Sequence, residues 1–353
     1  MTVATPSPVR PVASPSPSPV DDPAISRSDL SELIAVSVLA PISWLLPQWL
    51  WVAAGRAISF AIAGIRPDVT RRRMRRLREA LGPGPSDADL LALRVQIMSA
   101  YMEERLQILR EYRPGGWRPR LRLVGREHLD AARAAGRGAM LMVCPFSYAD
   151  LVVKKALHDA GFRVSHLSTF SRGFSPNSCH AWQPTRFGMS TLSRLRTRIE
   201  DRYLDERIIV PRSGGLGYLR QMEERLRGGG FVSFRAGNVG HRSVEVRLFG
   251  GRLALASGAP NLALSVGAPL LPVFVVRRGL ATFDVVVEPP LEAAPSPDRR
   301  AAIEDQLQRY AVLLESRIRR DPYLWSGWYR LVMDGAAKIT GAPATLAGIG
   351  GGA

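Results

Sequence analysis

The sequence is poor in cysteine and histidine, and each shortage excludes a class of site. Cys144 and Cys179 are the two cysteines among 353 residues, and this pair provides neither a metal-ligand spacing nor a disulfide framework. We therefore expect no bound metal, and a reducing cytoplasmic setting is the simplest one for the chain. An imidazole base would have to come from a short set: His128, His158, His166, His180 and His241.

Lysine is also scarce, although the chain is strongly basic. Basic residues outnumber acidic ones by 48 to 31, which gives a formal net charge of +17, and only three of the basic residues are lysine. The arginine bias, with abundant Ala, Gly and Pro, is typical of a GC-rich bacterial coding sequence. The charge favours anionic partners, namely anionic lipid head groups or an acidic carrier protein. We expect no nucleic-acid partner, because the arginines are dispersed and no recognition motif occurs.

Both ends of the chain are low in complexity. Residues 1–30 are rich in Pro and Ser and lack the charged start and apolar core of a signal peptide, so a disordered arm is predicted. The Gly- and Ala-rich residues 335–353 are predicted to form a flexible tail. Between them, apolar and amphipathic helices are expected over 31–115 and an α/β domain over 116–334.

An uncharged apolar segment covers residues 33–55, about the length of a bilayer-spanning helix. Pro41 and Pro47 would kink or break a regular span, and the arginine-rich run 71–76 places a cationic face nearby. An interfacial membrane anchor is therefore favoured over a true span. The alternative is a buried N-terminal helical hairpin. Three tryptophans in the segment suit the head-group boundary: Trp44, Trp49 and Trp51.

Beyond an amphipathic helix at 87–112, strand and helix patterns alternate. Strands are predicted at 139–143, 164–170, 207–210, 231–234, 244–249, 270–276 and 283–287, and helices at 149–160, around 186–200, and at 215–227, 258–266 and 298–319. The alternation predicts an α/β fold with a mixed, mostly parallel central sheet flanked by helices. Ligands bind at the carboxyl ends of such strands. The stretch V-C-P-F-S-Y-A-D-L (143–151) lies at one of these ends.

An ordered set of sequence blocks carries a family resemblance. The blocks are R-R-R-M-R-R-L-R-E-A-L-G (71–82), the turn before Asp150, R-S-G-G-L-G-Y-L-R (212–220), L-F-G-G-R-L-A-L-A-S-G-A-P-N-L-A (248–263) and P-Y-L-W-S-G-W-Y-R (322–330). Their order resembles the bacterial lauroyl/myristoyl acyltransferases of lipid A assembly, within the lysophospholipid acyltransferase-like superfamily. The resemblance implies a thioester donor, either acyl carrier protein or coenzyme A, with no bound cofactor. It also implies a lipid or glycolipid acceptor and a place on the cytoplasmic face of the inner membrane, either peripheral or with a single N-terminal anchor.

The turn departs from the family motif at its first residue. The family uses His-x-x-x-x-Asp/Glu, in which the His removes the acceptor hydroxyl proton and the acid orients the imidazole. Here Pro145 stands in the place of the His and Asp150 in the place of the acid. Three explanations remain open: a surrogate base, an amine acceptor that needs less help from a base, or a catalytically inactive member that binds acyl chains, lipid or carrier protein.

Asp150 and His166 are the candidate catalytic residues. His166 lies in the strand V-S-H-L-S, which could end at the same cleft, so it is the most plausible surrogate base. Asp150 also has a structural explanation as a helix-start carboxylate with Lys154 one turn on. Cys144 should face away from Pro145, because neighbouring strand positions point to opposite faces.

The candidate substrate-binding residues surround the same sheet edge. Arg172 and Asn177 follow the second strand, where the resemblance implies a basic residue against substrate phosphate. Arg235 and Asn238 stand where the family carries an Asp-Gln pair. Phe249 and Gly250 are expected to shape the groove wall. The remaining candidates come from the turn and from the glycine-rich start of a helix: Pro145, Ser147, Tyr148 and Arg212.

Overall fold

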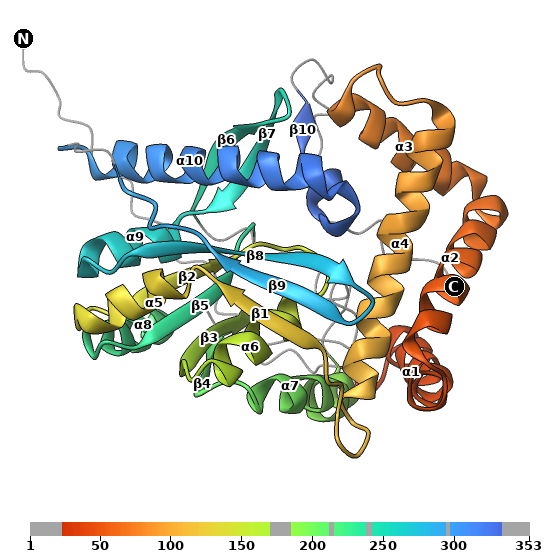
Figure 1. The fold of residues 1–353 in the computed structure, drawn as a ribbon, viewed down its shortest axis with the longest axis horizontal. Helices are drawn as coiled ribbons and strands as arrows, with labels where there is room; N and C mark the ends of the chain where they lie inside the picture. The colour runs from red at the N-terminus through yellow and green to blue at the C-terminus, as the bar shows by residue number, and fades with distance from the viewer. Residues whose placement is uncertain (1–22, 170–184, 212–214, 238–241, 294–296, 334–353) are drawn as a thin grey trace, which may run out of the picture.

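The computed structural model describes residues 23–169, 185–211, 215–237, 242–293 and 297–333. Four helices come first and lie together at one side of the molecule, with α1, α2 and α3 packed against α4 (Figure 1). Ser26 and Ser86 begin two of them through capping boxes with Asp29 and Asp89. The four helices are α1 (Arg27–Leu45), α2 (Gln48–Ile65), α3 (Pro67–Leu81) and α4 (Asp87–Arg110).

The apolar segment at 33–55 is divided between α1 and α2. Pro47 is the residue before α2, so the helix breaks there, whereas Pro41 is accommodated inside α1. By length and composition, α2 is long and apolar enough to cross a membrane. Both helices pack on α4 yet leave large apolar side chains exposed, including Trp49 at 61% and Phe60 at 63%. The pair is therefore a helical hairpin that is only partly buried.

A seven-stranded sheet forms the centre of the molecule, in the order β1-β9-β8-β2-β5-β3-β4. Every neighbouring pair is parallel except β8 and β9, which confirms the predicted mixed, mostly parallel sheet. All five residues of β2 are buried, as expected where helices cover both faces. The strands are β1 (Arg120–Val124), β2 (Ala139–Val143), β3 (Val164–Thr169), β4 (Glu206–Val210), β5 (Phe231–Arg235), β8 (Leu270–Gly279) and β9 (Thr282–Val287).

The connecting helices flank this sheet (Figure 1). The helix predicted around 186–200 consists of a π-helical turn, η2, that continues into α7. The helices and turns are α5 (Arg126–Ala134), α6 (Ala149–Asp159), η2 (Gly188–Leu192), α7 (Ser193–Asp201), α8 (Gly217–Arg227), α9 (Gly258–Val266), α10 (Arg299–Arg320), η3 (Pro322–Leu324) and η4 (Gly327–Arg330).

A small antiparallel sheet packs against α10 through β6. Its strands are ordered β10-β7-β6. Only β6 among them was predicted. Gly251 explains how β10 comes so close, because a Cβ at this position would stand 2.7 Å from the carbonyl oxygen of Val332. The strands are β6 (Ser243–Leu248), β7 (Gly251–Ala256) and β10 (Val332–Met333).

Candidate functional site

The turn that leads from β2 into α6 is fixed by one tyrosine. Tyr148 precedes α6 in the left-handed region, with φ 73°, a conformation that costs a non-glycine residue about 1–2 kcal/mol. Its buried hydroxyl donates to Glu103 Oε2 of α4 at 2.9 Å and accepts from Arg277 Nη1 of β8 at 2.9 Å. These bonds hold the strained turn between α4 and the sheet.

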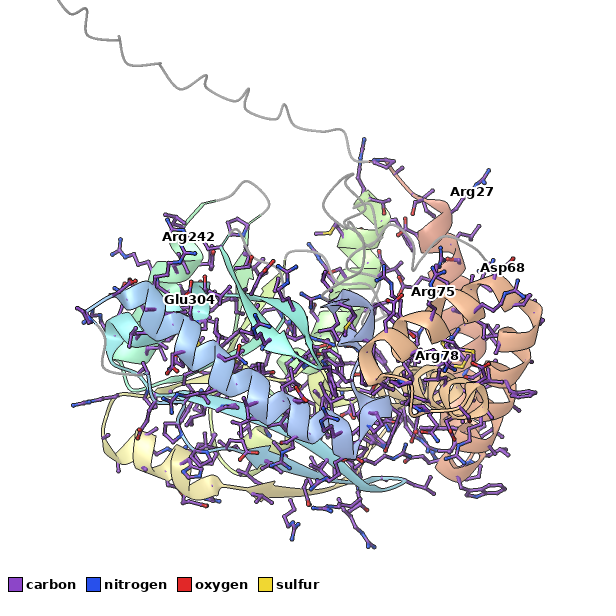
Figure 2. All side chains as sticks on the ribbon, turned by 90° about the horizontal axis from the view of Figure 1, so that it is seen from above. Arg27, Asp68, Arg75, Arg78, Arg242 and Glu304 are labelled. Carbon is purple, nitrogen blue, oxygen red and sulfur yellow. The ribbon has the colours of Figure 1, made fainter. Side chains whose placement is uncertain are left out.

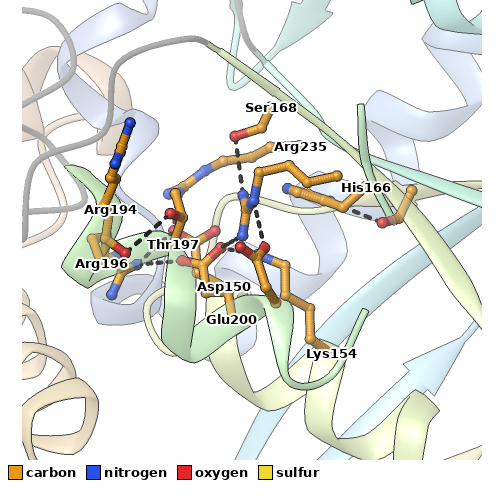
Figure 3. A network of polar contacts seen from close by, with 12 residues as sticks. Asp150, Lys154, His166, Ser168, Arg194, Arg196, Thr197, Glu200 and Arg235 are labelled. Carbon is orange, nitrogen blue, oxygen red and sulfur yellow. Dashed lines mark hydrogen bonds and ion pairs between the residues drawn. The ribbon is translucent and has the colours of Figure 1, made fainter. Parts of the chain in front are cut away.

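Asp150 lies in the first turn of α6, as predicted, and its carboxylate is buried among guanidinium groups. Arg235 Nη1 of β5 lies 2.9 Å from Asp150 Oδ2, and Arg196 Nη2 of α7 lies 3.4 Å from the same oxygen. Arg196 also pairs with Glu200 Oε1 at 3.0 Å, and Glu200 receives Lys154 Nζ and Arg207 Nη2 at its other oxygen. Figure 3 shows Asp150 and Lys154 of α6, Arg196 and Glu200 of α7, and Arg235 of β5 converging. Asp150 is thus part of a buried ionic network.

Glu104 of α4 is a second buried carboxyl group at this turn. The backbone N–H of Tyr148 donates to it. Burial and, after it, the negative charge of Asp150 raise the pKa of Glu104 to about 7, although Arg235 and Arg196 act in the opposite direction. Sequence reasoning missed this residue, because one glutamate in an amphipathic helix carries no motif. The one signal in the sequence was the pair of adjacent acids, Glu103 and Glu104, which stands between apolar residues of this predicted helix.

His166 and Cys144, the two other side chains considered for catalysis, are both buried. His166 lies in β3, and its Nδ1 is 2.9 Å from Ser233 Oγ of β5. It flanks the network in Figure 3, two strands from the Asp150 turn. Cys144 is fully buried, and burial raises the pKa of its thiol far above the ordinary value. A thiolate nucleophile is therefore disfavoured at Cys144.

Pro145 faces a small apolar space rather than the ionic network. The space has a volume of about 10 Å³, room for about one water molecule. Arg330 lies at its edge, since a Cβ on Gly237 would stand 3.0 Å from Arg330 Nη1 and 3.8 Å from Pro145 Cγ. The apolar lining comes from β7, α10 and the segment after α10: Leu253, Leu255, Tyr310, Leu314 and Trp325.

The segment 322–333 closes over the turn, and we name it the C-terminal strap. The N–H of Ser147 donates to Leu324 O at 2.7 Å. Ser326 Oγ donates to Pro145 O at 3.0 Å, and Phe146 forms a β-bridge with Trp325. The strap then pairs with β7 through β10. It thereby satisfies backbone groups of a turn that lies far earlier in the sequence.

Phe249 and Gly250 form the tight turn between β6 and β7. Both have positive φ, 51° and 71°, as a two-residue hairpin turn of this type requires. The Phe249 ring packs on Trp328 of the strap, with centroids 5.3 Å apart. These two residues therefore adjoin the strap. Four other candidates lie outside the described residues: Arg172, Asn177, Arg212 and Asn238.

A larger cleft than the space beside Pro145 lies elsewhere. It has a volume of about 640 Å³ and is lined by residues 111–119, by the C-terminal half of α6, and by Arg202 and Tyr203 just after α7. Lys155 Nζ inside it is bonded to Glu111, to the carbonyl of Trp117 and to the Tyr203 hydroxyl. Its buried charges are thus already paired. Within the described residues, no group of three or more His, Cys, Asp and Glu side chains could hold a metal ion.

Comparison with known proteins finds a family model that matches part of the chain and a weakly similar solved structure. Residues 194–329, less than half of the chain, match the bacterial lipid A biosynthesis acyltransferase family. The match begins after the 144–150 turn and includes Arg196, Glu200 and Arg235. The chain is also similar to the crystal structure of the 1-acyl-sn-glycerophosphate (LPA) acyltransferase PlsC from Thermotoga maritima, at 13% identity and a TM-score of 0.33, over 79% of this chain and 100% of that chain. A similarity this weak does not bear on the site. No curated protein matches the chain. Over residues 194–329 the chain is therefore similar to the bacterial lipid A biosynthesis acyltransferases, in agreement with the resemblance carried by its sequence blocks.

Proposed function

We propose that this protein transfers a fatty acyl group from an acyl thioester, on acyl carrier protein or coenzyme A, to a lipid, glycolipid or amine acceptor. The observation that supports the proposal is the meeting of two buried carboxyl groups, Glu104 and Asp150, at the turn where the family motif places its base and acid. Glu104 takes the part of the missing imidazole, because a carboxyl group with a pKa of about 7 can accept a proton near neutral pH.

The proposed reaction balances with these residues. The acceptor hydroxyl gives its proton to the Glu104 carboxylate as its oxygen bonds to the thioester carbonyl carbon. The carbon–sulfur bond then breaks, and the leaving thiolate takes the proton back from Glu104, so the products are an ester and a free thiol. Asp150, held by Arg196 and Arg235, raises the basicity of Glu104 through its charge. A neutral amine acceptor would follow the same course to an amide.

The proposal includes association with a membrane surface. Supporting it, α1 and α2 expose large apolar side chains, among them Trp49, Phe60 and Ile65. The next helix, α3, exposes arginines such as Arg71 and Arg75, and Figure 2 shows Arg27, Arg75 and Arg78 on this helical side of the molecule. Exposed apolar groups beside cations suit a bilayer with anionic head groups. The proposed place is the cytoplasmic face of the inner membrane, with an acidic acyl carrier protein as a partner.

Purified protein incubated with a radiolabelled acyl thioester and membrane lipids tests the proposal. We expect labelled lipid with the wild type and a loss of about 100-fold or more with Glu104→Gln, the typical contribution of a general base. Asp150→Asn should also lower the rate. Glu304→Gln, an exposed carboxylate on α10, is the matched control and should keep the wild-type rate. Unchanged transfer by Glu104→Gln would show that Glu104 is not the base.

A second function is favoured by the tight enclosure of the same site. Asp150 is buried and ion-paired, and Glu104 is only 4% exposed. A catalytically inactive protein that binds acyl chains, lipid or carrier protein would have such a closed turn. The same incubation separates the two: binding of the acyl thioester with no labelled product from any acceptor supports the binding protein and contradicts the enzyme.

A further inference from the structure

A buried arginine of α4 lies close to α3 and the strap and has no counter-charge among the described residues. Arg94 of α4 is 2% exposed, and its Nε has no hydrogen-bond partner. No hydrogen bond or ion pair holds its guanidinium anywhere in the described chain. Other buried basic residues are paired, as Arg196 is with Asp150 and Lys155 is with Glu111. An unpaired buried charge is among the most unfavourable features a folded protein can contain.

The groups around Arg94 make the imbalance larger. Burial lowers the pKa of Arg94, and the charge of Arg73 on α3 lowers it further. Arg73 lies over the ring of Tyr329 in η4, with 5.4 Å between its Cζ and the ring centroid. The Tyr329 hydroxyl is buried and has no hydrogen-bond partner within the described residues. Two guanidinium groups and one hydroxyl thus converge with unused hydrogen-bond donors, and no carboxylate among the described residues opposes them.

We propose that Arg73, Arg94 and Tyr329 form a binding site for a phosphate-type oxyanion. Such a group accepts several hydrogen bonds at once and offers the negative charge that the two arginines lack. Both of its sources share this chemistry: a phosphate of a lipid head group, or the phosphate of a soluble metabolite. The position of α3, directly after the apolar surface of α2, favours the lipid head group. The site is separate from the Asp150 turn and does not rest on the proposed acyl transfer.

Equilibrium binding tests the site with three probes: inorganic phosphate, coenzyme A, and dihexanoyl phosphatidic acid with dihexanoylglycerol as its phosphate-free counterpart. Arg94→Met keeps the apolar stem and removes the charge. We expect saturable binding of at least one phosphate probe by the wild type, weakened tenfold or more in Arg94→Met and severalfold in Tyr329→Phe. Arg300→Met, at an arginine that is 85% exposed on α10, loses the same charge and should bind as the wild type does. Dihexanoylglycerol should not compete.

The probes also distinguish the source of the phosphate. Tighter binding of phosphatidic acid than of coenzyme A identifies a lipid head group, and the reverse order identifies a soluble phosphate compound. Equal binding by Arg94→Met and Arg300→Met, or no saturable binding of any probe by the wild type, overturns the proposal. None of these results depends on acyl transfer.

The melting temperature separates a binding role of Arg94 from a purely structural one, because the two roles predict opposite changes in Arg94→Met. A site that awaits a ligand is destabilised while it is empty. Without phosphate, Arg94→Met should therefore melt at or above the wild-type temperature, and phosphate should raise the melting temperature of the wild type but not that of the variant. A lower melting temperature for Arg94→Met, with phosphate stabilising both proteins equally, would assign Arg94 a structural role and contradict the site.

Discussion

In the proposed mechanism, Glu104 and Asp150 come from distant parts of the chain and together act at the turn that follows β2. A histidine at 145 would carry a titrating group on the turn itself, whereas here the titrating group comes from α4, and its pKa is set by burial and by Asp150. The helix also supplies Glu103, which anchors the same turn through Tyr148. The chemistry of the turn therefore depends on how α4 is seated against the sheet.

The pKa of Glu104 makes stability depend on pH in a direction opposite to that of most carboxylates. The folded protein retains a proton up to about pH 7 that the unfolded chain releases near pH 4.5. The contribution of Glu104 to the free energy of unfolding is therefore fully present below pH 4.5. As the pH rises from there to about 7, the free energy of unfolding falls by on the order of 3 kcal/mol. In urea unfolding between pH 4.5 and 8, Glu104→Gln should lack this loss. Glu304→Gln should retain it, and parallel profiles for the wild type and Glu104→Gln would refute the assignment.

The sequence places Asp150 correctly but does not reveal its partners. A carboxylate in the first turn of a helix follows from the pattern after β2, whereas Arg196 is 46 residues away and is one of many arginines. No spacing in the sequence distinguishes a buried arginine from an exposed one. The sheet order decides which arginines reach Asp150, and that order comes from long-range pairing.

At the scale of elements, the strands of the central sheet were predicted except β1, whereas β7 and β10 of the small sheet were not. The strand at 139–143 is a continuous apolar run and coincides with β2. By contrast, β1 alternates leucine with exposed arginine at the edge of the sheet, and β7 begins at a glycine. Apolar periodicity reports burial, so strands with one solvated face or a glycine start give a weak signal. The division of 33–55 at Pro47 followed from proline chemistry.

The first two helices carry the expected membrane contact. Replacing both Trp49 and Phe60 by serine removes two large exposed apolar groups from α2. Since each fully buried aromatic contributes about 2 kcal/mol, we expect vesicle binding to fall by about tenfold or more. Sedimentation with vesicles rich in phosphatidylglycerol measures it. Val312→Ser on α10, where the valine is 63% exposed, should leave binding unchanged, and equal loss in both variants would argue against a docking face on α2.

At the scale of the whole molecule, the net charge of +17 governs encounters. An acidic carrier protein would be attracted over a distance of about 10 Å at moderate salt, and added salt screens that attraction. The association rate with acyl carrier protein should therefore fall by about tenfold or more between low and physiological ionic strength, while the dissociation rate changes little. Stopped-flow mixing measures both rates. An association rate independent of salt would remove the carrier protein from the list of partners.

The C-terminal strap determines when the turn before Asp150 can be completed during biosynthesis. The strap satisfies Pro145 O through a residue 181 positions later in the chain. During translation the sheet can begin to pair while the turn still lacks this partner, because domains acquire structure as the chain emerges. The turn before Asp150 therefore becomes complete only after the strap leaves the ribosome. A nascent chain stalled before residue 322 would hold the sheet without the finished site.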